Sequence, residues 1–314
     1  MPRWRRAAPS LKSKVFPAER TGKMELIKIT DEELKEIQRK SLDIVKYIAA
    51  LCREHDIKFF LYGGSVIGAL REHGFVPWDD DMDIKFTPAE YEKFKKVWEQ
   101  YADKERFTLW EQGKGHNDHT LSPSIRDNNT TLITDSTVNY DVNQGLSVDL
   151  GVCEAGAATR LGEIVQMVCG AGMGLFKAGR VPARKGRLTK TVAKIILGIF
   201  RTENSQYYMW KFFETIALAP NKHYETAEYV KEIEMFPKLK FKREWFDDVR
   251  WVPFEDTELP IPVGAEEYLK ARYGNYMELP PEKDRHPEHR IVFLDLNTPY
   301  KKYRGSKYFV NGGK

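Results

Sequence analysis

The residues best suited to chemistry lie in one short stretch, YGGSVIGALREHGFVPWDDDMDIKF, which runs from Tyr62 to Phe86. It places two glycines and a serine ahead of four aspartates: Asp79, Asp80, Asp81 and Asp83. Like charges at this density repel each other, so a folded chain needs a reason to gather them. Three explanations of the grouping make different demands on the chain.

The first two explanations are a solvated turn and a calcium loop. An exposed acidic turn suits Asp79 and Asp80, but it does not explain why an apolar strand resumes through Asp83. The second explanation assigns Asp79, Asp81, Asp83 and Glu90 to positions 1, 3, 5 and 12 of an EF-hand. The β-branched Ile84 then stands where that loop needs glycine for a sharp turn, which argues against calcium.

The third explanation is a phosphate site built around Asp81 and Asp83. Residues two apart in an extended strand share a face, with backbone positions about 6.6 Å apart. Two such carboxylates do not both ionise comfortably without a cation. Mg²⁺ resolves this conflict because it binds one or two carboxylates together with substrate phosphates, and Mn²⁺ is the alternative ion.

The residues before and beyond this pair complete the predicted site. Gly63, Gly64 and Ser65 allow backbone N–H groups to approach a phosphate at the start of a helix. Asp149 is the sole charge in the strand-like run 146–152 and is the candidate third carboxylate. The chemistry would be in-line displacement at phosphorus, with the metal neutralising the developing charge.

The elements that must position these residues are predicted from periodicity and caps. Thr30 and Glu33 form a capping box, which predicts a helix over 31–55, and Thr87-Pro88 opens another helix. Ser65 is expected to cap a short helix that ends near residue 72. Strands are predicted at 57–62, 82–86, 107–111, 121–126, 131–134 and 146–152, and a final helix at 265–273.

Composition and cysteine usage indicate a folded protein in a reducing compartment. Of 314 residues, 41% are hydrophobic, which is enough to bury a core. Cys52, Cys153 and Cys169 are odd in number and widely spaced, so a disulfide framework or zinc site is disfavoured. We therefore expect a cytoplasmic protein.

Positive charge is concentrated in two segments. Residues 1–23 carry +6 and residues 177–200 carry +7 with no acid, so a net charge of +4 leaves −9 for the remainder. A nucleic-acid-binding protein more often spreads its basic residues over a folded face, so no nucleic-acid partner is expected. The 1–23 segment lacks the apolar core of a secretory signal and is predicted to be a flexible tail.

The apolar stretches at 164–176 and 195–200 are shorter than the roughly 20 residues of a membrane span. The basic, amphipathic segment 160–200 suits contact with an anionic membrane surface or a lipid-linked glycan, which would make the protein peripheral at the inner face of the plasma membrane. The alternative is an ordinary helical subdomain packed on the catalytic core.

These motifs resemble the LicD family of phosphotransferases. The signature YGGSVIGALREHGFVPWDDDMDI is followed, in family order, by SIRDNNTT, GLSVDLGV, FKREWFDDVRWVPFEDTELPIP and YLKARYGNYMELPP. The family includes bacterial enzymes that move phosphocholine from CDP-choline onto cell-surface glycans, with fukutin-type transferases as distant relatives. The resemblance implies an α+β, nucleotidyltransferase-like core of the polymerase-β type, with a mixed sheet.

The resemblance also implies roles for individual residues. Asp81, Asp83 and Asp149 would bind the metal and carry catalysis, and Gly63, Gly64 and Ser65 would line the donor phosphates. Arg71 and Arg126 match basic positions of the pattern and would neutralise phosphate, although Arg71 also suits a helix-terminal surface charge.

Further residues are candidates for substrate contact. Trp78 could stack on a base or a quaternary ammonium, and packing explains it equally well. Arg285, His286 and His289 follow the last family motif and could bind phosphate or acceptor, against the alternative of a surface loop. No residue is identified as the general base.

The expected organisation is a tail at 1–23, a catalytic core at 24–154, a helical insertion at 155–235 and a C-terminal extension at 236–314. The expected function is Mg²⁺-dependent transfer of a substituted phosphate, most often phosphocholine in this family, from a CDP-alcohol to a hydroxyl of a cell-surface glycan or lipid-linked sugar, with release of CMP. Two alternatives stay open: attachment of a nucleotide to a small acceptor, and a non-enzymatic regulatory protein at a membrane surface.

Overall fold

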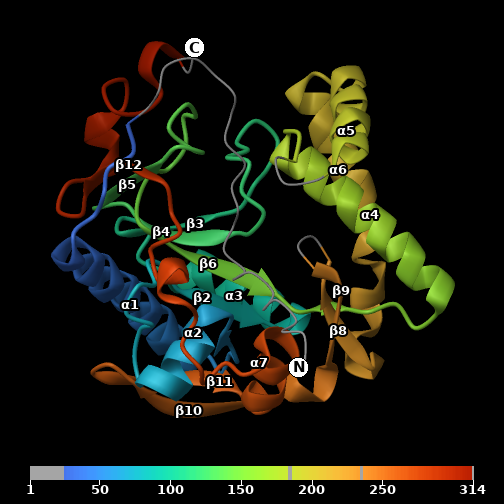
Figure 1. Cartoon of the computed structure of the whole chain (residues 1–314), viewed down its shortest axis with the longest axis horizontal. Coiled ribbons are helices and arrows are strands. Elements are labelled where there is room, and N and C mark those ends of the chain that lie inside the picture. The colour runs from blue at the N-terminus through green and yellow to red at the C-terminus, as the bar shows by residue number, and fades with distance from the viewer. Residues whose placement is uncertain (1–24, 183–185, 234–235, 313–314) are drawn as a thin grey trace.

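A five-stranded mixed sheet forms the centre of the protein. The computed structural model describes residues 25–182, 186–233 and 236–312, so the predicted tail at 1–23 lies outside the described residues. The strands follow the order β1 (Phe60–Leu61), β2 (Asp83–Phe86), β6 (Ser147–Val152), β4 (Ser124–Asp127) and β3 (Phe107–Trp110) (Figure 1). Strands β2 and β6 are parallel, whereas the other neighbours are antiparallel. The predicted α+β class and mixed sheet are confirmed.

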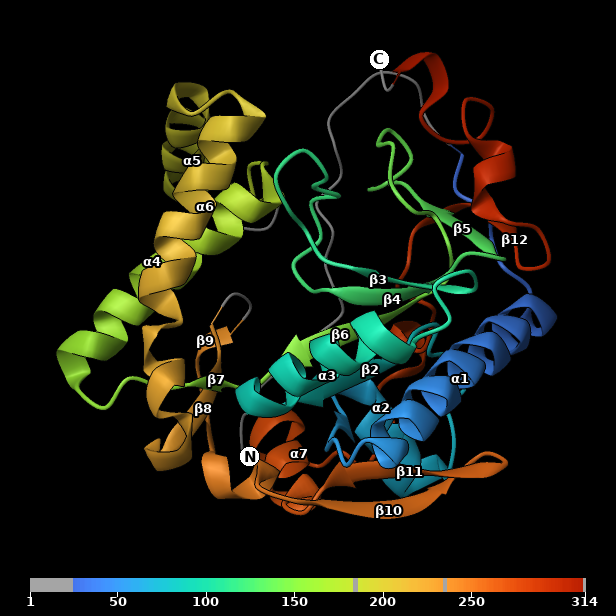
Figure 2. The same ribbon diagram turned by 180° about the vertical axis from the view of Figure 1, so that it is seen from behind.

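Two long helices cover one face of this sheet (Figure 2). Helix α1 (Asp31–Glu54) begins with the predicted capping box of Thr30 and Glu33, and α3 (Pro88–Tyr101) begins after Thr87, whose side chain accepts from the N–H of Glu90. Their apolar stripes face the core, where Ile37 and Phe94 are fully buried. The three cysteines are buried and form no disulfide, in agreement with the prediction.

The connection from β1 to β2 differs from the prediction at Ser65. Helix α2 (Gly64–Ile67) starts after Gly63, makes no side-chain capping bond, and continues as a π-helical turn over Gly68–Glu72. The Ser65 hydroxyl instead accepts a 3.1 Å hydrogen bond from the backbone N–H of Asp83. The predicted cap was wrong because this hydroxyl ties the helix start to β2.

Strands in the C-terminal half were largely missed. Strand β12 (Ile291–Asp295) pairs with β5 (Thr131–Thr134), and β10 (Val249–Phe254) forms a hairpin with β11 (Thr257–Pro262). The hairpin contains Pro253, Pro260 and Pro262, which weaken the sequence signal, although edge strands tolerate proline. Helix α7 (Ala265–Tyr273) has the predicted bounds.

The stretch expected to be helical stands to one side of the sheet (Figures 1 and 2). It contains α4 (Arg160–Ala178), α5 (Arg187–Ile199) and α6 (Glu203–Ala217). It also contains β8 (Tyr229–Glu232), which was not predicted and which pairs with β7 (Glu154–Ala155) and β9 (Phe236–Lys242). Among the described residues, no helix combines the length and the apolar character needed to cross a bilayer.

Candidate active site

The glycine turn lies directly against two of the aspartates. Gly63 has a φ of +59°, a conformation that favours glycine, and it is the residue before α2. A Cβ atom on Gly63 would lie 3.2 Å from Oδ2 of Asp83, and one on Gly64 would lie 2.7 Å from Oδ2 of Asp79. The absence of side chains at both positions therefore lets carboxylates approach the turn backbone.

Asp83 and Asp149 lie on the neighbouring strands β2 and β6 at the centre of the sheet, and Asp81 lies just before β2. Asp81 and Asp83 are half-buried and alternate with the fully buried Met82 and Ile84, and β2 itself begins at Asp83. Asp83 on β2 is the register partner of Asp149 on the neighbouring parallel strand β6. Burial, together with the charge of Asp81, raises the pKa of Asp149 to about 6. The three carboxylates thus interact unfavourably when all are ionised.

Asp79 and Asp80 are buried, with 5% and 3% of their surfaces exposed. The interpretation of these residues as a solvated acidic turn was therefore wrong. The Asp80 carboxylate accepts hydrogen bonds from the backbone N–H groups of His289 at 2.9 Å and Glu288 at 3.4 Å. Asp80 thus anchors the C-terminal loop that contains Glu288 and His289. The calcium-loop interpretation also fails, because Ile84 continues the extended strand β2 between β1 and β6.

The C-terminal loop brings His289 to the aspartates. Its ring Nδ1 lies 3.2 Å from Oδ1 of Asp80 and 3.9 Å from Oδ2 of Asp81. Ligand atoms of these three residues all lie within 4.8 Å of one another. A histidine held in this way can exchange a hydrogen bond or a proton with a group bound at the edge of the aspartate face.

A cavity of about 400 Å³ adjoins this loop. Its wall combines Trp78 and the C-terminal residues with the segment that leads into α1; the lining includes Arg285, His286, His289, Pro77, Thr30 and Asp31. The guanidinium carbon of Arg285 lies 5.7 Å from the ring centroid of Trp78. Four of the predicted contact residues, Trp78, Arg285, His286 and His289, therefore lie together.

The two predicted phosphate-binding arginines are held by other groups. Arg126 forms a buried ion pair with Asp118 and donates to the Ser124 hydroxyl at 3.0 Å. Burial opposes ionisation of Asp118, but Arg126 and hydrogen bonds from Thr120 outweigh it and lower the pKa of that carboxyl. Arg71 is half-buried and donates to the backbone carbonyl of Tyr276 at 2.9 Å. Phosphate binding by either arginine stays a prediction.

A buried charged cluster adjoins the glycine turn and was not predicted. Glu232 accepts hydrogen bonds from the Tyr62 hydroxyl and from Arg272, and the Lys85 ammonium lies 3.9 Å from its carboxylate. The stem of Lys85 passes over Gly151, where a Cβ would come within 2.6 Å of it. The cluster fixes the two residues that flank the site in sequence, Tyr62 before the turn and Lys85 after Asp83.

Tyrosines connect this cluster to the turn. The Tyr268 hydroxyl accepts a 3.3 Å hydrogen bond from the N–H of Gly63. Burial, and more weakly the charges of Glu232 and Asp83, raises the pKa of Tyr273 to about 12. Tyr268, Arg272 and Tyr273 belong to the motif YLKARYGNYMELPP, and Lys85 follows Asp83 by two positions on the same strand face, whereas Glu232 carried no sequence signal.

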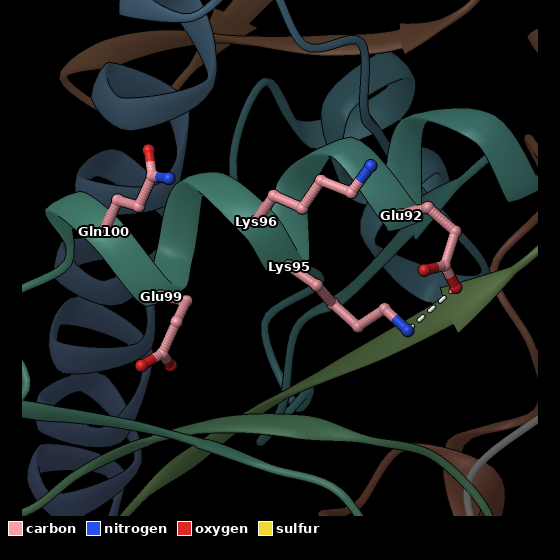
Figure 3. Close-up of a pocket in the computed structure, with 5 residues that line it drawn as sticks. All are labelled: Glu92, Lys95, Lys96, Glu99 and Gln100. Atoms are coloured by element: carbon pink, nitrogen blue, oxygen red, sulfur yellow. Dashed lines mark ion pairs between the residues drawn. The ribbon is translucent and has the colours of Figure 1, made fainter.

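A separate hollow of about 410 Å³ lies on α3. Figure 3 shows the five residues that line it. The hollow is lined by Glu92, Lys95, Lys96, Glu99 and Gln100, and Lys95 and Glu92 form a 2.7 Å ion pair there. All five side chains belong to one helix and none is a predicted site residue. We interpret this hollow as the solvated face of α3.

Comparison with known proteins supports the resemblance seen in the motifs. Residues 56–144 match the family described as LicD/FKTN/FKRP, nucleotidyltransferase domain. The chain is also 28% identical over 269 residues to the lipopolysaccharide cholinephosphotransferase LicD of Haemophilus influenzae, a match that covers 82% of this chain and 96% of that protein. The matched family segment contains the glycine turn and the aspartate run, whereas Asp149 and His289 lie beyond it.

The raised pKa of Asp149 predicts a stability cost at neutral pH. In the native state this carboxyl holds its proton up to about pH 6, so its contribution to the free energy of unfolding is present at pH 4 and is lost as the pH rises through 6. In EDTA, the free energy of unfolding of Asp149→Asn, measured relative to that of the wild type, should therefore increase by about 1–3 kcal/mol when the pH is raised from 4.5 to 7.5. Urea denaturation at both pH values measures this change.

The exposed Asp284→Asn variant serves as the matched control. A stability difference for Asp149→Asn that is the same at both pH values would contradict the predicted role of carboxylate repulsion.

The buried pair of Arg272 and Glu232 predicts non-additive stability effects. Arg272→Met leaves Glu232 buried without its guanidinium partner and should lower the free energy of unfolding by about 3–5 kcal/mol. The double variant Arg272→Met/Glu232→Gln removes both charges and should recover part of that loss. Urea denaturation of the single and double variants gives the coupling energy, and additive losses would refute the pairing.

Proposed function

Since residues 56–144 belong to the LicD/FKTN/FKRP nucleotidyltransferase-domain family, and the chain is a distant homologue of Haemophilus influenzae LicD, we propose that this protein is a LicD-type phosphotransferase. Its donor would be a CDP-alcohol, most directly CDP-choline, given the name of that relative. Its acceptor would be a hydroxyl of a cell-surface glycan or a lipid-linked sugar, of which lipopolysaccharide is the nearest example.

The juxtaposition of the glycine turn with Asp83 and Asp149 carries the proposal. Asp83 contacts the turn through the space that Gly63 leaves open, and it is in register with Asp149 on the next strand. A phosphate held by the turn would therefore lie beside the carboxylate face. A solvated surface turn does not require this arrangement.

The carboxylate set fits a divalent cation. Burial and, after it, the charge of Asp81 raise the pKa of Asp149, so ionisation of this carboxyl is unfavourable without an added positive charge. All three proposed ligands offer carboxylate oxygen, the donor type that Mg²⁺ prefers and Mn²⁺ also accepts. When bound by Asp81, Asp83 and Asp149, the ion would neutralise charge on the transferred phosphate.

The chain's own residues would bind and orient the two substrates. The turn at Gly63, Gly64 and Ser65 would line the donor phosphates. In this structure the Gly63 N–H donates to the Tyr268 hydroxyl and the Ser65 N–H donates to the Tyr62 carbonyl. Asp80 holds His289 at the edge of the aspartate face, where its ring can contact the acceptor hydroxyl. Arg285 already lies near the ring of Trp78, so the support for choline comes from the similarity to LicD and not from a vacant aromatic ring.

The reaction exchanges one phosphorus–oxygen bond for another. The acceptor hydroxyl oxygen would form a bond to the phosphorus distal to the nucleoside, and the bond from that phosphorus to the bridging oxygen of CMP would break. The hydroxyl proton leaves with a base, and the product is a phosphodiester plus CMP. Attack on the phosphorus next to the nucleoside would instead attach CMP to the acceptor, which is the nucleotidyltransferase alternative.

Release of CMP tests the proposal and identifies the donor. We expect CMP when the protein is incubated with Mg²⁺, lipopolysaccharide and the preferred member of a set comprising CDP-choline, CDP-ethanolamine, CDP-ribitol and CDP-glycerol. Asp81→Asn and Asp83→Asn should each lower the rate at least about 100-fold, because each removes a charge that acts on the transferred phosphate. Chromatographic measurement of CMP and mass analysis of the acceptor report both results.

Asp256→Asn, an exposed aspartate paired with Lys46, provides a matched control and should keep full activity. Retained activity in both the Asp81 and Asp83 variants would refute the mechanism. Pyrophosphate release from CTP, with a nucleotide on the acceptor, would establish nucleotidyl transfer instead.

A further inference from the structure

Exposed hydrophobic side chains concentrate on helices α4, α5 and α6. Of the 18 large hydrophobic residues that are exposed in the described part of the chain, ten belong to these three helices. The most exposed are Leu188 at 79%, Leu161 at 72% and Ile199 at 70%. Scattered exposed hydrophobics are normal on a soluble domain, but a concentration on one substructure marks an interaction surface.

These residues form stripes at helical spacing. On α4 the stripe comprises Leu161, Ile164, Val165 and Val168, and on α5 it comprises Leu188, Val192, Ile195 and Ile199. Positions separated by three, four and seven residues lie on one face of a helix. Each helix therefore presents a continuous apolar face to solvent.

The exposed stripes are distinct from the faces that pack inside the insertion. Met173, Phe176 and Trp210 form a buried cluster, and α5 contributes Ile196 and Leu197 to it. Helix α5 is thus already packed on its neighbours through other residues. The stripe of Leu188 to Ile199 is additional apolar surface that the internal packing does not use.

The charge on α5 identifies the partner. The helix carries Arg187, Lys190 and Lys194 and contains no acidic residue. In the described part of the chain no acidic side chain forms an ion pair with these three residues. An amphipathic helix with one apolar face and a polar side rich in Lys and Arg is the type that lies in the headgroup region of an anionic bilayer.

The aromatic residues and the length of the helix agree with a surface location. Tyr208 and Phe212 are exposed one turn apart on α6, and tyrosine is enriched where an apolar phase meets water. Helix α5 has 13 residues, which span about 20 Å, whereas a bilayer core is about 30 Å thick. It can lie in the interface but cannot cross it.

We propose that α4 and α5 dock this protein on the surface of an anionic lipid bilayer. The apolar stripes would enter the boundary between headgroups and acyl chains, and Arg187, Lys190 and Lys194 would contact lipid phosphates. The proposal does not depend on the proposed transferase activity. It uses helices that stand to one side of the sheet carrying the aspartate site (Figure 1).

Co-sedimentation of the full-length protein with vesicles tests this surface. We expect binding to vesicles of mixed phosphatidylglycerol and phosphatidylcholine, and at least tenfold weaker binding to phosphatidylcholine alone. Leu188→Ser/Ile195→Ser/Ile199→Ser and, separately, Lys190→Glu/Lys194→Glu should each weaken binding to the anionic vesicles at least tenfold. Because every variant retains the basic segment 1–23, these differences report on α5 alone.

Met277→Ser/Leu279→Ser removes exposed hydrophobic residues outside the insertion and should bind as the wild type does. Thermal denaturation followed by circular dichroism checks that each variant is folded. Unchanged binding of both α5 variants, or equal binding to the two kinds of vesicle, would overturn the proposal. Failure to bind vesicles, combined with self-association that the triple serine variant abolishes, would overturn it in favour of a second copy of the chain.

Discussion

The carboxylates of Asp81, Asp83 and Asp149 repel one another, and the central sheet determines how close they must lie. Parallel pairing of β2 with β6 puts Asp83 in register with Asp149, and Asp81, two residues before β2 begins, acts on Asp149 through its charge. The sheet could relieve this repulsion only by changing its register, which would expose buried Met82 and Ile84. Burial of the hydrophobic residues thus maintains an electrostatically unfavourable site.

The buried arginines beside the site are paired with other carboxylates, and Arg126 offsets the repulsion at Asp149 only in part. Arg126 is engaged by Asp118, and Arg272 by Glu232, each in a buried pair beside the site. Such pairs add little net stability, but their geometry is demanding, since removal of one member leaves a buried charge. They hold Tyr62, Lys85 and the strand end at Ser124 in place beside the aspartate face.

Local sequence signals predicted the helices and strands of the first half of the fold, including the strand that begins at Asp83. Thr30, Thr87 and the alternation around Asp83 act over a few residues, so the capping and strand rules apply directly. The buried partners Asp118 and Glu232 were not predictable, because their roles depend on Arg126 and Arg272, which are positioned by the tertiary fold. The β10–β11 hairpin was missed because its prolines obscure the strand pattern.

The contact between Asp80 and His289 joins residues 209 positions apart. A ribosome makes the chain from its N-terminus, so the glycine turn and all the aspartates emerge well before the loop that closes over them. Once all the aspartates have been synthesised, the site still lacks His289, Arg285 and the strand β12 that pairs with β5. Assembly of the site is therefore one of the last events in the formation of the protein, and a chain that stops short of this loop carries the aspartates without the pocket beside them.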